Sequence, residues 1–176
     1  MSGAVVLETK RLRLVPFSLR HLTERYVAWL NDPEVVRYSE QRFRQHTLGS
    51  CREYWMSFEG TPHAFWAIEA LDSSQGHVGN ITAHVDAHNQ TADVGILVGE
   101  RAAWGRGLGG EAWSAVVEHL LAQPGVRKVT AGTLSCNAAM LAVMRRSGMV
   151  DDGRRARQCL VDGAEMDVVH AARFRA

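Results

Sequence analysis

The chain has 176 residues, of which 46% are hydrophobic and 22% are charged, and its 20 Lys and Arg nearly balance its 19 Asp and Glu. A chain of this length is most simply one domain, here residues 1–176, and buries roughly 70% of the surface that the unfolded chain exposes. The balanced charge predicts neither a nucleic-acid partner nor attachment to an anionic membrane. The apolar runs are too short to span a bilayer, and the first residues do not resemble a signal peptide.

The number and spacing of the cysteines indicate the cellular compartment. Cys51, Cys136 and Cys159 form an odd and widely spaced set, which fits neither a disulfide framework nor a zinc site. We therefore expect reduced thiols, no bound metal and a cytoplasmic location.

The first third of the chain predicts a strand and two helices. Residues 7–17 alternate apolar and charged side chains, as a half-buried strand does. Ser18 can cap a helix that stops near residues 31–33, and Thr47 can cap a second helix. The polar segment 34–46 between them is predicted to be a connection.

The rest of the chain predicts alternating strands and helices. Residues 91–100 and 127–134 are strand-like and flank a helical segment, so they need a parallel, right-handed crossover. The other predicted strands should pair antiparallel, which makes the fold class α/β (α+β) with a mixed, mostly antiparallel sheet. The remaining predicted elements are strands 63–71 and 77–85 around a loop at 72–76, a short helix 137–146 closed by Gly148, and a C-terminal hairpin of 157–161 and 165–172 around Asp162-Gly163.

The stretch Trp104–Ala112 (W-G-R-G-L-G-G-E-A) joins the strand at 91–100 to that helix. It has four glycines in six residues, so the N–H groups and the positive dipole end of the helix are uncovered. Such a place binds anions, above all phosphates, although a tight turn without a ligand is the alternative. The predicted buried face of the helix comprises Ala112, Trp113, Val116, Val117, Leu120 and Leu121.

Two common phosphate loops fit this stretch poorly. A Walker loop needs Gly-Lys-Ser/Thr at its end, whereas Glu111 follows Gly110 here. The glycine spacing matches a dinucleotide-binding fingerprint, but the next strand-like run, residues 127–134, carries no acidic residue to hold a ribose.

Trp104–Ala112 instead resembles the acetyl-CoA pyrophosphate loop of the GNAT acetyltransferase superfamily, and its leading tryptophan resembles the RimJ/RimL-like branch. Asn137, followed by Arg145-Arg146-Ser147-Gly148-Met149, resembles a second element of the family. The resemblance covers residues 7–174. It implies a GNAT fold whose sheet is splayed at the acetyl-CoA site and flanked by helices, and an acetyl-CoA-dependent N-acetyltransferase.

The resemblance also implies a donor site. Backbone N–H groups of residues 105–110 would hold the pyrophosphate, and pantetheine would pair with the edge of Ile96–Val98, opened by a bulge near Gly95 or Gly99. Arg101 and Arg106 would meet CoA phosphates or be solvated. The residues predicted to bind acetyl-CoA are Ile96, Leu97, Val98, Trp104, Gly105, Arg106, Gly107, Leu108, Gly109, Gly110 and Asn137.

The proton-transfer groups are less determined. Positions that carry a tyrosine, a serine and a strand glutamate in many relatives are Met144, Met140 and Gly132 here, so no acid or base transfers from the resemblance. Candidate bases lie on the acceptor side. The candidates are His84, Asp93 and Glu40, with Asp86 as a further one.

The acceptor is predicted from charge. Segment 34–46, which borders the acceptor site in the resembled fold, has more basic than acidic residues, and residues 30–35 resemble a stretch frequent in amino-sugar pathways. We expect the acceptor to be a small-molecule amine, and most specifically a nucleotide-linked amino sugar whose diphosphate pairs with arginine. The basic residues are Arg37, Arg42 and Arg44, and the acidic ones are Glu34 and Glu40.

Two alternatives remain open at this point. The acceptor is a peptide N-terminus if the chain is a ribosomal-protein type of acetyltransferase. The chain is a non-catalytic acyl-CoA sensor if the missing tyrosine and serine reflect lost catalysis. A monomer and a homodimer are both compatible with the sequence.

Overall fold

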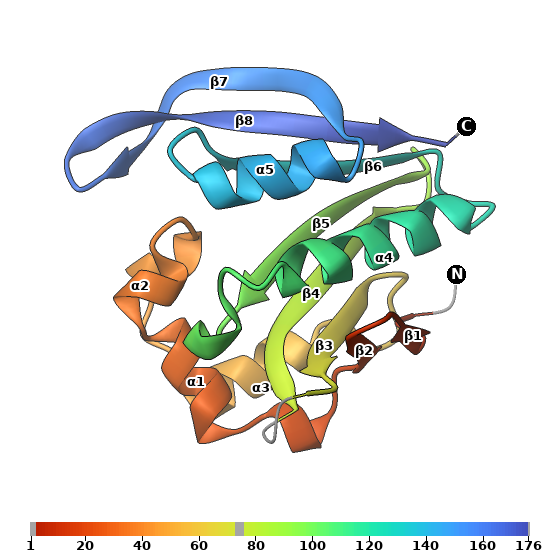
Figure 1. Cartoon of the computed structure of the whole chain (residues 1–176), viewed down its shortest axis with the longest axis vertical. Coiled ribbons are helices and arrows are strands. Elements are labelled where there is room, and N and C mark those ends of the chain that lie inside the picture. The colour runs from red at the N-terminus through yellow and green to blue at the C-terminus, as the bar shows by residue number, and fades with distance from the viewer. Residues whose placement is uncertain (1–2, 73–75, 176) are drawn as a thin grey trace.

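The computed structural model describes residues 3–72 and 76–175 and shows within them an eight-stranded mixed sheet, ordered β1-β2-β3-β4-β5-β6-β8-β7 (Figure 1). The strands are β1 (Leu7–Glu8), β2 (Leu12–Pro16), β3 (Ala64–Ala70), β4 (His77–Asp86), β5 (Thr91–Val98), β6 (Lys128–Leu134), β7 (Val150–Val161) and β8 (Ala164–Phe174). The α-helices are α1 (Glu24–Leu30), α2 (Pro33–Val36), α3 (Leu48–Met56), α4 (Leu108–Ala122) and α5 (Ala138–Arg146). Short 3₁₀ helices are η1 (Leu19–His21), η2 (Glu40–Phe43) and η3 (Arg101–Ala103).

Helices cover both faces of the sheet. Figure 1 shows α4 and α5 in front of the strands and α3 behind them. The α4 face holds the larger core, in which the predicted buried stripe of α4 is confirmed. A second core lies under α1 and α3 and contains Phe17, Tyr26 and Trp29. The stripe residues are Ala112, Trp113, Val116, Val117 and Leu120, with Leu121 packed at its margin.

Strands β5 and β6 form a fork. They pair in parallel only where residues 91–93 meet residues 128–130, as the crossover prediction requires. Beyond that point β5 continues along β4 to Val98, while β6 continues along β8 to Leu134. Each strand follows its antiparallel neighbour, because antiparallel pairing is more stable per residue than parallel pairing. The mixed, splayed sheet expected from the sequence is therefore present.

The bulge predicted near Gly95 or Gly99 lies at Gly99. The register between β4 and β5 runs without a shift from the pair Asp86 and Thr91 to the pair Gly79 and Val98, so β5 has no bulge at Gly95. At the end of the strand the backbone N–H groups of Gly99 and Glu100 both donate to the Val78 carbonyl at 3.0 Å, so two residues lie opposite one. The fork itself opens because β6 leaves β5.

The N-terminal elements also differ from the prediction. The single strand expected at 7–17 is a hairpin, because Thr9 bonds Leu12 through its backbone N–H and its hydroxyl and so reverses the chain. Ser18 begins only the turn η1, and Thr23 caps α1 in its place by accepting the Tyr26 N–H. Side-chain competition for backbone groups decides both boundaries.

The remaining boundaries follow exposure and turn chemistry. Strand β7 begins at Val150, seven residues before the predicted start at 157, because an exposed edge strand lacks the alternation that marks a buried one. The predicted turn at Asp162 and Gly163 is confirmed, and both residues have positive φ. Segment 34–46 contains α2 and η2. Of the predicted loop 72–76, residues 73–75 lie outside the described part of the chain.

In the described residues, no helix is long and apolar enough to cross a membrane. In the same residues, no group of three or more His, Cys, Asp or Glu side chains is placed to hold a metal ion.

Gly99 lets the second core close against the end of β5. A Cβ atom there would lie 2.1 Å from the Trp29 indole. We expect Gly99→Ala to lower the free energy of unfolding by about 1–3 kcal/mol, as overpacking does. Gly49→Ala in α3, where the nearest atom lies at 3.6 Å, is the matched control and should be neutral or stabilising. Urea denaturation measures both, and equal stability of the two variants would contradict the expectation.

Candidate active site

The glycine loop sets the start of α4. Gly105 and Gly107 have φ of 72° and 78°, which non-glycine residues rarely adopt, and Gly107 is the N-cap of the helix. Gly109 lies in the first turn, where a Cβ atom would be 3.2 Å from Val98 Cγ2. The glycines therefore turn the chain and let the helix N-terminus approach the end of β5, which leaves its N–H groups available to an anion.

An acidic residue in the first turn of α4 connects the glycine loop to the β1–β2 hairpin. Glu111 accepts hydrogen bonds from the Thr9 hydroxyl at 2.6 Å, the Arg11 backbone at 2.9 Å and Arg11 Nε at 2.7 Å. Arg11 also donates to the Arg106 carbonyl at 2.8 Å. The sequence does not predict this contact, because nothing in the local pattern of residues 9–11 indicates a partner a hundred residues away.

The exposed edge of β5 lies beside this helix start. In the described residues, β5 has no partner strand on its β6 side from Val94 to Val98. The Trp104 indole N–H donates to the Val98 carbonyl at 2.7 Å, so this predicted site residue covers one end of the edge. Backbone groups nearer the fork, around Ile96, remain for an extended ligand such as pantetheine, which would add as a strand.

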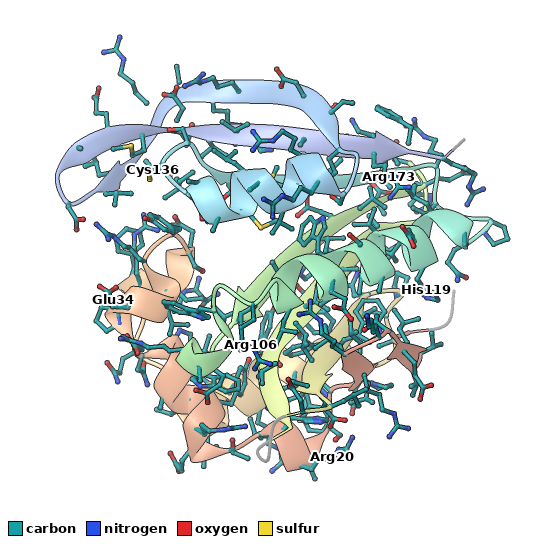
Figure 2. All side chains as sticks on the ribbon, viewed as in Figure 1. Arg20, Glu34, Arg106, His119, Cys136 and Arg173 are labelled. Atoms are coloured by element: carbon teal, nitrogen blue, oxygen red, sulfur yellow. The ribbon has the colours of Figure 1, made fainter. Side chains whose placement is uncertain are left out.

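The two arginines predicted to bind CoA phosphates are paired with acidic residues of the protein itself. Arg101 makes a bidentate pair with Asp32, at 2.6 and 3.0 Å, and this hydrogen bonding holds the pKa of Asp32 below its usual value. Arg106 pairs with Asp72, and Figure 2 shows it beside the N-terminal end of α4. Asn137 caps α5 by accepting the Met140 N–H and donates to Thr133 on β6.

Two of the predicted bases lie on the sheet face opposite α4. His84 and Asp93 are cross-strand neighbours, and Asp93 accepts a 2.7 Å hydrogen bond from the Thr130 hydroxyl across the base of the fork. Burial, aided by His63, lowers the pKa of His84 against the opposing effect of Asp93, so its ring is neutral near pH 7. The ring packs against His63 and Phe58.

The other two candidates lie apart from this group. Glu40 begins η2, is largely exposed and pairs with Arg42 at 3.4 Å. Asp86 closes a turn by accepting hydrogen bonds from Asn89. The structure therefore brings His84 and Asp93 together and leaves Glu40 on a different element.

A tyrosine that the sequence does not mark as a site residue lies near the fork. Gly95 is two residues past the last β5–β6 pair, and a Cβ atom on it would lie 3.5 Å from Thr82 Oγ1. The Tyr54 hydroxyl on α3 hydrogen-bonds the Thr82 side chain. Burial raises the pKa of Tyr54 in spite of that bond, so the phenol keeps its proton at neutral pH. Spacing could not reveal it, because α3 and β4 meet only in the folded chain.

A pocket of about 410 Å³ lies across the open end of the fork. One wall is α2 and η2, on the β5 side, and the other is the β7–β8 turn, on the β6 side; Figure 1 shows the two walls facing each other. Arg37 joins them by a 3.1 Å pair with Asp162. The charged residues of the lining are Arg37, Arg42, Arg44 and Asp162.

Glu111 makes stability depend on pH. Burial alone would raise its pKa, but the hydrogen bonds from Thr9 and Arg11 outweigh burial and lower it. A lowered carboxyl pKa stabilises the fold above the unfolded-state value, so this contribution should be lost as the pH falls below about 4.3.

We expect Glu111→Gln to lower the free energy of unfolding at pH 7 by about 1–3 kcal/mol and to remove this part of the acid sensitivity. Glu118→Gln, on the exposed side of α4, is the control and should stay within about 0.5 kcal/mol of wild type. Denaturation at pH 7 and again at about pH 3, well below the unfolded-state pKa of a glutamate, measures both effects, and an unchanged acid sensitivity in Glu111→Gln would contradict the assignment.

Comparison with known proteins tests the resemblance. The family model described as an acetyltransferase (GNAT) domain matches residues 11–150. No curated protein sequence matches the chain.

Solved structures share the fold. RimL, a ribosomal alpha-N-protein acetyltransferase in complex with coenzyme A, aligns with a TM-score of 0.82 at 16% identity over 96% of this chain and 97% of that one. Spermidine N-acetyltransferase from Vibrio cholerae, in complex with CoA and spermine, aligns with 0.81 at 13% identity over 95% and 97%. The microcin C7 self-immunity acetyltransferase MccE, in complex with acetyl-CoA and AMP, aligns with 0.79 at 13% identity over 94% and 93%.

The glycine loop at the start of α4, the fork beside it and the family match over most of the chain agree with one another. The chain belongs to the acetyltransferase (GNAT) domain family and is an N-acetyltransferase whose acetyl donor is acetyl-CoA.

Proposed function

We propose that this cytoplasmic N-acetyltransferase, of the RimJ/RimL-like branch, acetylates the primary amine of a small molecule that also carries an anionic group. A nucleotide-linked amino sugar is the sharpest form of the proposal. The observation that carries it is the charge of the pocket across the fork, where Arg37, Arg42 and Arg44 face a single acid, Asp162. Arginine binds phosphates through paired N–H donors, so a diphosphate suits this lining.

The present contacts of these arginines are compatible with binding. The pair between Arg37 and Asp162 is exposed on both sides, and such pairs contribute little, so an anion can replace the carboxylate. Arg42 donates to backbone carbonyls of Ser39 and Leu160, which orients its guanidinium along the wall. Arg44 is exposed and has no side-chain partner among the described residues.

The donor site proposed for acetyl-CoA follows the predicted residues. The N–H groups of the glycine loop would hold the pyrophosphate, and the free edge of β5 around Ile96 would hold pantetheine. At the base of the fork lie Asp93 and its cross-strand neighbour His84, which stay candidates for handling the amine proton, and Glu40 stays one from the pocket wall. Asp93 suits the reception of an ammonium group, because its carboxylate faces the base of the fork.

Acetylation of a peptide N-terminus is the second candidate, favoured by the similarity to RimL in fold. The arginines of the pocket argue against it, since a cationic N-terminus needs acidic partners. A non-catalytic sensor would bind CoA and release no thiol. One assay separates the three: thiol release from acetyl-CoA with a nucleotide-linked 4-amino-4,6-dideoxy sugar, glucosamine, spermidine or an N-terminal peptide as acceptor.

The donor site predicts an effect of the first-turn glycine. In Gly109→Val, the branched side chain meets Val98 and pushes the helix start away from β5, so loop N–H groups lose the pyrophosphate. Each lost charge-assisted hydrogen bond costs about 1.5–3 kcal/mol, so the affinity for CoA should fall at least about 10-fold. Gly49→Val, also in the first turn of a helix, is the control for placing a valine at such a position away from the donor site. Unchanged CoA affinity of folded Gly109→Val in calorimetry would exclude this placement.

The acceptor pocket predicts a charge effect. Arg44→Glu should raise KM for the nucleotide-linked amino sugar about 10-fold or more, because it removes a charge-assisted contact, and should leave KM for acetyl-CoA unchanged. Arg13→Glu, on β2 and three strands away from β5, is the matched control. Strong turnover of the N-terminal peptide together with none of the amino sugars would overturn the acceptor proposal and leave the N-acetyltransferase assignment intact.

A further inference from the structure

A histidine occupies the space that a side chain at position 132 would fill. Gly132 is two residues past Thr130, the last residue of β6 that pairs with β5. Ala131 packs into the core on the α4 side, so the Cβ direction of Gly132 is toward the opposite face, where Asp93 and Thr130 meet. A Cβ atom on Gly132 would lie 3.1 Å from Nδ1 and 3.2 Å from Cε1 of His170. The imidazole of β8 therefore lies over Gly132, at the point where the fork opens.

The ring is not held by a hydrogen bond at its buried end. His170 Nε2 is buried and has no hydrogen-bond partner among the described residues, whereas Nδ1 lies over Gly132 on the side of the fork. Leaving such a group unpaired costs about 1–3 kcal/mol, so a purely structural histidine is usually satisfied. His21 and His77, which are buried in the second core, have their Nε2 atoms paired with Glu69 and Asn80. His46 also has an unpaired Nε2, but it lies next to the acceptor pocket and not at the fork.

The position suits a group that handles the reacting amine. With paired strands about 4.8 Å apart and about 3.3 Å per residue, and with β6 diverging beyond Thr130, Gly132 lies at least roughly 8 Å from the α-carbon of Asp93. An ammonium held at Asp93 and a thioester carbonyl in the fork would both lie within reach of a ring over Gly132. His84 is less well placed, because it lies on β4, one strand further from the opening, and packs between Phe58 and His63.

We propose that His170 is a catalytic residue, whose Nδ1, the ring nitrogen that lies over Gly132, accepts the proton from the acceptor amine. The amine nitrogen forms the C–N bond to the acetyl carbon, the C–S bond breaks, and the pair of electrons of that bond leaves on the CoA thiolate. The proton lost by nitrogen passes to Nδ1, in the tautomer that carries its hydrogen on Nε2, and is returned through solvent as the thiolate is protonated. The proposal rests on the N-acetyltransferase assignment and is independent of which amine is the acceptor.

The test replaces the imidazole of His170 in variants chosen to keep the chain folded. Thiol release is measured with whichever amine of the panel above is turned over best, for wild type, His170→Ala and His170→Gln. Both variants should lose about 10²-fold or more in kcat while KM for acetyl-CoA changes less than about threefold. Gln keeps the size and polarity of the side chain, so its loss reports on proton transfer if Ala impairs folding. His119→Gln, a histidine that packs on Trp66 from α4, is the matched control and should keep wild-type kcat.

A swap makes the test sharper. Gly132 has no left-handed backbone conformation, so a side chain is sterically admissible once the ring has gone. In the double variant Gly132→Glu/His170→Ala, a carboxylate from β6 enters the vacated space and should recover kcat at least about 10-fold over His170→Ala.

Three results would overturn the proposal. The first is kcat of His170→Ala and His170→Gln within about threefold of wild type. The second is a loss in His84→Ala that His170→Gln does not share. The third is a loss in both His170 variants that raises KM for acetyl-CoA in parallel and that the folded double variant does not recover, which would assign His170 a structural role. Failure of the acceptor proposal would appear separately, as a different preferred amine in the wild-type panel.

Discussion

The short parallel contact between β5 and β6 is the constraint on which the rest of the structure depends. The two strands share three residue pairs and then follow their own antiparallel partners, β4 and β8. A longer contact would close the sheet and leave no free edge for the donor. A missing contact would detach the two halves and lose the alignment of α4 with the end of β5. The fork is therefore an opening between two strands that each stay paired with an antiparallel neighbour.

The donor side of this cleft is made by backbone, and distant side chains hold it in place. Glycines 105, 107 and 109 allow the turn and the close approach to β5, and they contribute no functional groups of their own. Glu111 and the β1–β2 hairpin supply the rigidity that the glycines remove, because Arg11 spans the loop carbonyl at Arg106 and the helix carboxylate. The helix start proposed to bind phosphates is thereby held in place while its N–H groups stay accessible.

The pocket proposed for the acceptor is lined by side chains that come from elements on the two sides of the fork. The α2–η2 wall lies on the β5 side and the β7–β8 turn on the β6 side, so the Arg37–Asp162 pair joins the two sides over the pocket. At the base of the fork, Asp93, Thr130 and the ring of His170 line the face opposite α4. The proposed donor site and the proposed acceptor pocket thus border the same opening, which suits the transfer of a group between them.

Local patterns in the sequence determined the family, the donor and most of the elements. The glycine loop and the apolar stripe of α4 are encoded within a few residues, so spacing alone predicts them. The start of β7 and the reversal at Thr9 were missed, because an exposed edge strand and a side-chain-to-backbone bond leave no periodic trace. The tertiary structure alone decided the groups around the fork. Arg11 reaches Glu111 across 100 positions, Tyr54 reaches Thr82 from another element, and His170 covers a glycine on the neighbouring strand. The physical reason is that a side chain's chemistry depends on the atoms beside it, and in this fold those atoms come from strands and helices far apart in the chain.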